Sequence, residues 1–253
     1  TRIESSAASD VYKRQILYIL TALLLSASLE AKDQISRVLF VGNSYTGQVR
    51  GTFLSMIKEA GADQIYFEFI TPGGCTLTRH LENQKTIKVI KEGNWDLVIL
   101  QEQSQTPGLP GQIGDSFQDA AGDLCVIIRS IGAEPVFYQT WGRRDGDKRN
   151  VGIYPDYETM QAKLSDAYSK AARRNSARMV SVGEAWKRTR EKFPGLGKKL
   201  YKADGSHPSA LGACLVSSVF IKEVFGIDPK TVQPPKGVSD KEFSQILSVI
   251  MAL

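Results

Sequence analysis

The chain has 253 residues, 42% of them hydrophobic, which is enough to bury one sizeable core. Its formal net charge of +5 is spread along the chain, and no basic run is interleaved with aromatic residues, so we expect no nucleic-acid partner. The three cysteines, Cys75, Cys125 and Cys214, are odd in number and lack C-x-x-C spacing, which excludes a disulfide framework and the usual zinc sites. Cys125 and Cys214 lie in apolar helical runs, and we interpret them as small core residues.

The first 31 residues are typical of an export signal. A basic pair at 13–14 precedes the apolar run 16–25, and small residues follow at 26–28. The run is too short to span a bilayer comfortably, so we expect cleavage near the end of this segment. The mature protein is then expected to be secreted or periplasmic, without stable membrane insertion. A buried N-terminal helix is the alternative interpretation, and residues 1–11 resemble a cloning or assembly remnant.

Residues 32–253 are expected to form a single domain of alternating strands and helices. Short apolar runs, rich in β-branched and aromatic residues, predict buried parallel strands at 38–41, 65–70, 96–100, 135–139 and 178–182. Amphipathic periodicity predicts helices from about 49 and at about 78–92, 115–131, 157–175, 183–192, 210–224 and 240–253. This alternation predicts an α/β fold, a flavodoxin-like three-layer α/β/α sandwich around a parallel sheet of about five strands.

The first predicted strand ends at Gly42-Asn43-Ser44, and a helical pattern follows. Ser44 therefore lies at the carboxyl end of a strand, which is the edge where open α/β sheets bind ligands. The nearby helix N-terminus offers unpaired N–H groups and a positive field, which suit an oxyanion or a phosphate. An ordinary helix-capping serine is the alternative interpretation.

A serine hydroxyl needs a base before it can attack a carbonyl. The chain has two histidines, His80 and His207, and Asp204 precedes His207 by three residues. One turn would let the Asp204 carboxylate orient the His207 imidazole, so we predict a triad of Ser44, His207 and Asp204. A capping role is the alternative for His207. His80 is interpreted as a packed or partly exposed histidine, or as a residue that lines the pocket.

Four stretches, in this order, are similar to the blocks of the SGNH (GDSL-type) hydrolase family. Gly42-Asn43-Ser44 resembles the Gly-Asp-Ser nucleophile block, with Asn43 in place of the aspartate. Gly74 matches the backbone donor of the second block. The segment Gln101-Glu102-Gln103-Ser104 stands where the family has Gly-x-Asn-Asp, and Asp204-Gly205-Ser206-His207 matches Asp-x-x-His in full. The pattern indicates a divergent branch of that family.

The resemblance implies a serine esterase that needs no cofactor and no metal. Ser44 would attack the ester carbonyl, and His207 would accept the proton and return it to the leaving alcohol, while Asp204 fixes the tautomer. The implied substrate is a small acyl ester, with an O-acetyl group on a carbohydrate preferred. The oligomeric state is left open.

The resemblance also implies an oxyanion hole. The backbone N–H groups of Ser44 and Gly74 and the side-chain amide of Gln103 would hold the developing charge. Gln101 is the competitor for the third position. Asn43 would support the turn by hydrogen bonding.

Two other classes of function stay open. The segment Ser44-Tyr45-Thr46-Gly47 also resembles the phosphate loop of flavodoxins, which would make the protein a flavin- or phosphate-binding module. A catalytically inactive SGNH fold that binds glycans is the other. Trp141, after the fourth predicted strand, would stack on a sugar ring in a glycan site or else cap the core.

Overall fold

The computed structural model describes residues 35–253, so the predicted export segment 1–31 lies outside the described part. One parallel sheet runs through this part in the order β2-β1-β3-β4-β5. Its strands are β1 (Arg37–Val41), β2 (Tyr66–Ile70), β3 (Leu97–Leu100), β4 (Glu134–Tyr138) and β5 (Arg178–Val180). The predicted five-stranded parallel sheet is confirmed.

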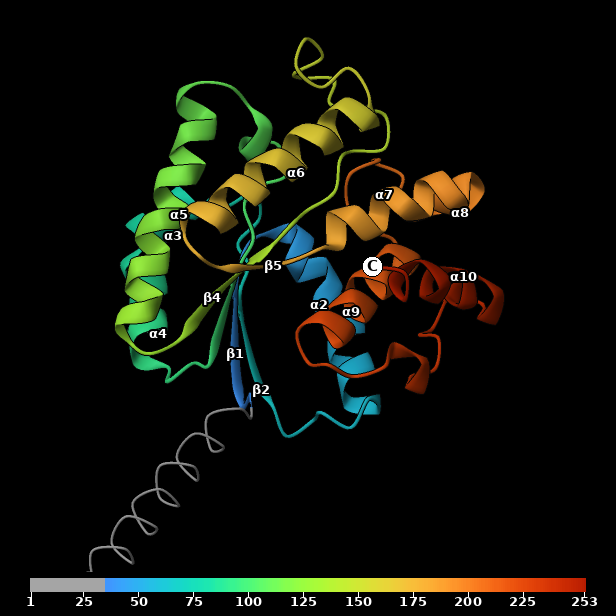
Figure 1. Cartoon of the computed structure of the whole chain (residues 1–253), viewed down its shortest axis with the longest axis horizontal. Coiled ribbons are helices and arrows are strands. Elements are labelled where there is room, and N and C mark those ends of the chain that lie inside the picture. The colour runs from blue at the N-terminus through green and yellow to red at the C-terminus, as the bar shows by residue number, and fades with distance from the viewer. Residues whose placement is uncertain (1–34) are drawn as a thin grey trace, which may run out of the picture. The chain divides into compact units, whose positions relative to one another are not determined.

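Helices cover both faces of the sheet, which confirms the three-layer sandwich (Figure 1). One face carries α3 (Leu77–Glu82), α4 (Gln84–Glu92), α5 (Gln112–Ser130) and α6 (Tyr157–Arg174). The other carries α2 (Ser44–Glu59), α7 (Val182–Lys192), α8 (Pro194–Lys199), α9 (Ala210–Glu223) and α10 (Asp240–Ile250). Short 3-10 helices lie at η1 (Thr106–Gly108) and η2 (Pro229–Thr231). Among residues 35–253, no helix combines the length and apolar character that crossing a bilayer requires.

The side chains of β1 show how the sheet builds two cores. Leu39 and Val41 point to one face and pack with residues of α3 to α6, because alternate side chains of a strand face opposite ways. Phe40 points to the other face, where its ring centroid lies 5.4 Å from Phe53 of α2 and 5.4 Å from Phe220 of α9. Strand β1, which lies between β2 and β3, is therefore buried on both sides, as its continuous apolar run predicts.

Side-chain capping, rather than apolar periodicity, sets the start of α2 and the break between α3 and α4. Helix α2 begins at Ser44 rather than near residue 49, because the Asn43 side chain accepts the Tyr45 N–H at 3.2 Å and starts the helix there. The predicted helix at 78–92 is two helices. They meet at Asn83, whose extended backbone ends α3 and whose side chain caps α4.

All three cysteines are buried and free in the structure. Burial raises the pKa of Cys125 to about 11 and that of Cys214 to about 12. Burial also raises the pKa of Cys75. The interpretation of Cys125 and Cys214 as core residues is confirmed.

Trp141 belongs to the core, because its side chain has no exposed surface. It lies between Trp186 of α7, with ring centroids 4.1 Å apart, and Tyr45 of α2, at 4.6 Å, and both pairs are stacked. Its indole N–H donates to the Ser206 carbonyl at 3.0 Å. Of the two interpretations of Trp141, the structure supports the core role, in which the indole backs the loop that carries His207.

Replacing Trp141 with alanine is expected to lower the free energy of unfolding by about 3–5 kcal/mol, because it leaves a large cavity between two stacked rings. Urea denaturation followed by circular dichroism measures the change. The control is Val126→Ala on α5, where the valine is 68% exposed and the expected change is within about 0.5 kcal/mol. Equal stability of Trp141→Ala and the wild type would contradict this packing.

Candidate active site

The structure brings Ser44, His207 and Asp204 together at the carboxyl edge of the sheet. Ser44 Oγ lies 2.9 Å from His207 Nε2, although the two residues are 163 positions apart in the chain. His207 Nδ1 lies 2.7 Å from Asp204 Oδ2. Helix α2 begins with Ser44, and α9 follows the Asp204–His207 loop closely. Helices α2 and α9 pack against each other, and the contact between Ser44 and His207 joins the start of α2 to the loop before α9.

Asp204 is held in the orientation that the histidine requires. Its Oδ1 accepts the backbone N–H groups of Ser206 and His207, each at 2.9 Å, which leaves Oδ2 for the imidazole. Partial burial acts to raise the pKa of the Asp204 carboxyl. The His207 side chain and the two N–H donors outweigh this effect and lower the pKa to about 2. The carboxylate is therefore ionised at neutral pH.

The turn before Ser44 requires glycine at position 42. A Cβ on Gly42 would lie 2.6 Å from Gln101 Oε1 and 2.8 Å from Thr46 Oγ1, so a side chain would displace both. The Gly42 N–H donates to Ile70 O at 3.0 Å. The turn is thereby fixed from β2 and from the segment after β3.

His80 supports the same turn from behind. It is buried on α3, and its Nε2 lies 2.7 Å from the Gly42 carbonyl, which is an acceptor. Burial lowers the pKa of His80, so the neutral imidazole donates its Nε2–H to that carbonyl. The structure thus supports the interpretation of His80 as a packed histidine and gives it a contact with the nucleophile turn.

Asn43 connects the nucleophile turn to two neighbouring segments. Its backbone N–H donates to Gln101 Oε1 at 3.0 Å, and its Nδ2 donates to Cys75 O at 3.0 Å. An amide has the donor for this second contact, which a carboxylate lacks. Gly74 precedes Cys75 and has a φ of +63°, a left-handed conformation that favours glycine. Asn43 therefore anchors the loop that carries Gly74.

Gln101 is committed to the fold. Its Oε1 accepts the Asn43 N–H at 3.0 Å and the Thr46 hydroxyl at 2.8 Å, while its amide nitrogen donates to the Glu102 carbonyl. The side chain is buried, at 1% exposure. This favours Gln103 over Gln101 as the third oxyanion donor.

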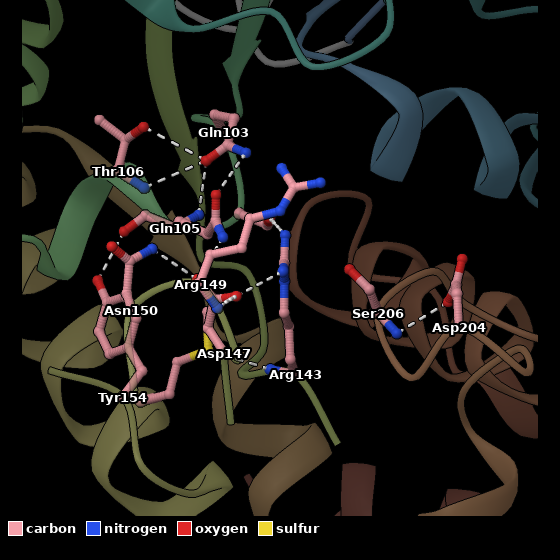
Figure 2. Close-up of polar contacts among 12 residues, drawn as sticks. Gln103, Gln105, Thr106, Arg143, Asp147, Arg149, Asn150, Tyr154, Asp204 and Ser206 are labelled. Atoms are coloured by element: carbon pink, nitrogen blue, oxygen red, sulfur yellow. Dashed lines mark hydrogen bonds and ion pairs between the residues drawn. The ribbon is translucent and has the colours of Figure 1, made fainter. Parts of the chain in front are cut away.

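Gln103 has a side chain whose oxygen is fixed by its own segment. Its Oε1 accepts the Gln105 N–H at 2.7 Å and the Thr106 N–H and hydroxyl at 3.3 Å each (Figure 2). The amide nitrogen lies 3.3 Å from Gln105 Oε1. The amide has two N–H groups, so this contact leaves one donor for a ligand. The structure thus places the Gln103 amide on the segment after β3, and its contact with an oxyanion stays a prediction.

A buried aspartate, Asp147, stabilises the segment that carries Gln103. Nothing in the sequence pattern indicated this role. The Asp147 carboxylate accepts from Arg143 Nη1 at 2.8 Å, from Asn150 Nδ2 at 2.7 Å and from the Gln105 side-chain amide (Figure 2). Burial acts to raise the pKa of Asp147, but these donors outweigh it, so the pKa is lower than its ordinary value. Arg143 Nη2 also contacts Ser104 Oγ at 3.4 Å. The loop after β4 is thereby tied to the segment that carries Gln103, through contacts about 40 residues apart that follow no sequence spacing.

The contact between Tyr45 and Ser206 was also not predicted from the sequence. Their hydroxyl oxygens lie 2.7 Å apart, and the Tyr45 ring meets the His207 ring edge-on with centroids 5.4 Å apart. Tyr45 is buried, which raises its pKa and keeps the phenol neutral. The pair links the start of α2 to the loop before α9, beside the triad.

No group of three or more histidine, cysteine, aspartate and glutamate side chains in residues 35–253 is arranged to hold a metal ion. The polar groups at this edge instead form a hydroxyl, an imidazole and a carboxylate in series, which is an arrangement that can activate a nucleophile.

No protein-family model and no curated protein matches this sequence. Solved structures do match. A candidate SGNH hydrolase from Slackia heliotrinireducens is 25% identical with a TM-score of 0.63, over 76% of this chain and 100% of that one. A DUF4886 family protein from Bacteroides uniformis is 18% identical with a TM-score of 0.72, over 87% and 94%. An acetyl xylan esterase is 14% identical with a TM-score of 0.60, over 74% and 99%. The chain therefore has the SGNH hydrolase fold.

Proposed function

We propose that the protein is a serine esterase that hydrolyses small acyl esters through Ser44, His207 and Asp204. The observation that carries the proposal is the unbroken chain of contacts from Ser44 Oγ to His207 Nε2 and from His207 Nδ1 to Asp204 Oδ2, at 2.9 and 2.7 Å. These are hydrogen-bond distances for a nucleophile, a base and the group that orients the base. The SGNH hydrolase fold supports the same reaction class.

The geometry supports a two-step acyl transfer. Ser44 Oγ attacks the ester carbonyl while His207 Nε2 takes its proton, and Asp204 stabilises the imidazolium. The tetrahedral intermediate collapses, the proton passes to the leaving alcohol, and the acyl group stays on Ser44. Water then attacks the acyl-enzyme with His207 again as the base, which releases the carboxylic acid and restores the Ser44 hydroxyl.

The proposed oxyanion hole has three donors. The Ser44 N–H lies in the first turn of α2, where N–H groups lack partners within the helix. The Gly74 N–H and the Gln103 amide lie on the two segments that flank this turn. Removing one such donor typically lowers kcat by about 10²–10³-fold.

The proposed substrate is an O-acetyl ester on a carbohydrate, and the proposed location is secreted or periplasmic. The export pattern of residues 1–31 supports the location. A match to an acetyl xylan esterase of the same fold suggests the ester to try first.

Purified protein is expected to release acetate from acetylated xylan oligosaccharides and to hydrolyse 4-nitrophenyl acetate faster than 4-nitrophenyl octanoate. Acetate release is measured by an enzyme-coupled assay, with alkali-deacetylated oligosaccharide as the control. A preference for the octanoyl ester would contradict the acetyl proposal. Failure to hydrolyse any ester, together with flavin absorbance of the purified protein, would favour the flavin-binding alternative.

A further inference from the structure

Glu102 is a buried carboxylate that the proposed reaction does not use. It follows β3 and has no exposed surface. Its Oε2 accepts the Leu77 N–H at 2.9 Å and its Oε1 accepts the Gln103 N–H at 2.5 Å. One side chain thus binds the backbone of two segments that are 26 positions apart in the sequence.

This carboxylate has no cationic partner among residues 35–253. The titratable groups that face it are the Tyr168 hydroxyl of α6, which accepts the Glu102 N–H at 3.1 Å, and the Cys75 thiol of the loop after β2. Burial raises the pKa of Glu102 to about 7, although the N–H groups of Gln103 and Leu77 oppose the rise. A buried charge without a counter-ion is costly, so its presence here calls for a role beyond packing.

The two segments that Glu102 binds are those that carry proposed oxyanion donors. Leu77 is three residues after Gly74, and Gln103 is the proposed third donor. We propose that Glu102 is a positioning residue, whose two backbone contacts fix the Gly74 loop and the Gln103 segment at the spacing that the oxyanion hole requires. This inference rests on the proposed esterase function. A displacement of about 1 Å in such a site can lower the rate by about 10²-fold.

The test is Glu102→Gln. A carboxamide has one oxygen, so it accepts one of the two N–H groups and turns its own N–H toward the other. With 4-nitrophenyl acetate, kcat is expected to fall by about 10-fold to 10²-fold while KM changes less than about twofold, because the oxyanion forms only in the transition state. Glu102→Asp keeps the charge but is one methylene shorter, so it cannot bridge both segments and is also expected to lower kcat.

The matched control is Glu223→Gln. Glu223 is half-buried, whereas Glu102 is fully buried, but burial raises its pKa as well, and its side chain accepts the Ser181 N–H at 2.8 Å. It lies at the last residue of α9, at the opposite end from His207. Its kcat is expected to stay within about twofold of the wild type, because a change outside the site leaves transition-state binding intact.

A second readout is the pH dependence of Tm. The folded-state pKa of Glu102 is raised from 4.5 to about 7, so between these values the folded protein holds a proton that the unfolded chain has lost. This contribution to wild-type stability is present below pH 4.5 and is lost as the pH rises through 7. Glu102→Gln lacks this contribution. The Tm of the variant should therefore rise relative to the Tm of the wild type as the pH increases over this range. Glu223→Gln reports the same effect for a carboxylate away from the site.

A third readout is coupling. If Glu102 acts by placing Gln103, then Glu102→Gln and Gln103→Ala remove overlapping contributions, and the double variant loses less activity than the product of the single losses. Multiplicative losses would assign Glu102 a role independent of Gln103 and overturn the positioning role. Full kcat in both Glu102→Gln and Glu102→Asp, with an inactive Ser44→Ala variant, would overturn this inference alone. An inactive wild type, or an active Ser44→Ala variant, would instead overturn the proposed function and this inference with it.

Discussion

Ser44→Ala is expected to lower kcat for 4-nitrophenyl acetate by about 10⁶-fold. The variant keeps Asn43, the helix cap and the His207–Asp204 pair, so its fold is expected to be intact. What it loses is the one oxygen in contact with the base. Initial rates beside circular dichroism and Tm separate lost chemistry from lost folding.

The control for this prediction is Ser130→Ala. Ser130 ends α5 and is exposed, and its hydroxyl donates to Ile127 O at 2.7 Å, so the same atom is removed from a surface serine. Its kcat is expected to match the wild type. A Ser44→Ala variant that retains more than about a tenth of the wild-type rate would exclude Ser44 as the nucleophile, since loss of a catalytic serine costs several orders of magnitude.

Asp204→Asn is expected to lower kcat by about 10⁴-fold at neutral pH. The amide can still occupy the loop, but it carries no charge to stabilise the imidazolium, and it favours the wrong tautomer of His207. Because the folded-state pKa of Asp204 is about 2, the wild-type carboxylate is ionised throughout the neutral range. The pH profile of kcat/KM, measured for both proteins, checks the size of the effect.

Asp63→Asn in the turn between α2 and β2 provides the matched control, since Asp63 is exposed and the substitution is the same. Wild-type kcat is expected there, because surface substitutions away from a site rarely matter. A loss smaller than about tenfold in Asp204→Asn would mean that the carboxylate does not act through His207, and the triad would then reduce to a dyad of Ser44 and His207.

The fold was largely predictable because its signals are local. Each predicted strand is an apolar run in the sequence. The sheet buries the runs of β1 and β3 on both faces, whereas β2 and β5, at its two edges, are only partly buried. The helix boundaries were harder to predict from the sequence, because side-chain caps set them. Nothing in the apolar periodicity marks Asn43 as the residue that starts α2, or Asn83 as the point where α3 gives way to α4.

The juxtaposition of Ser44 with His207 was predictable because each follows from a short-range pattern. Ser44 ends a strand–turn, and Asp204 lies one turn before His207. The contacts that hold these residues in place depend on tertiary packing, and they follow no regular separation along the sequence. Strand β3 ends at Leu100, so the alternation of side chains along a strand does not extend to Glu102, and its side chain turns back to accept the Gln103 N–H.

The measurement that tests the esterase proposal most directly is covalent labelling of the purified protein with a fluorophosphonate, followed by peptide mapping. This reagent phosphonylates an activated serine and leaves a tetrahedral group that resembles the intermediate of ester hydrolysis. The triad geometry predicts a single labelled serine, Ser44, with loss of labelling in His207→Ala. Labelling of another serine, or no labelling in a preparation that hydrolyses 4-nitrophenyl acetate, would contradict the assignment of Ser44 as the nucleophile.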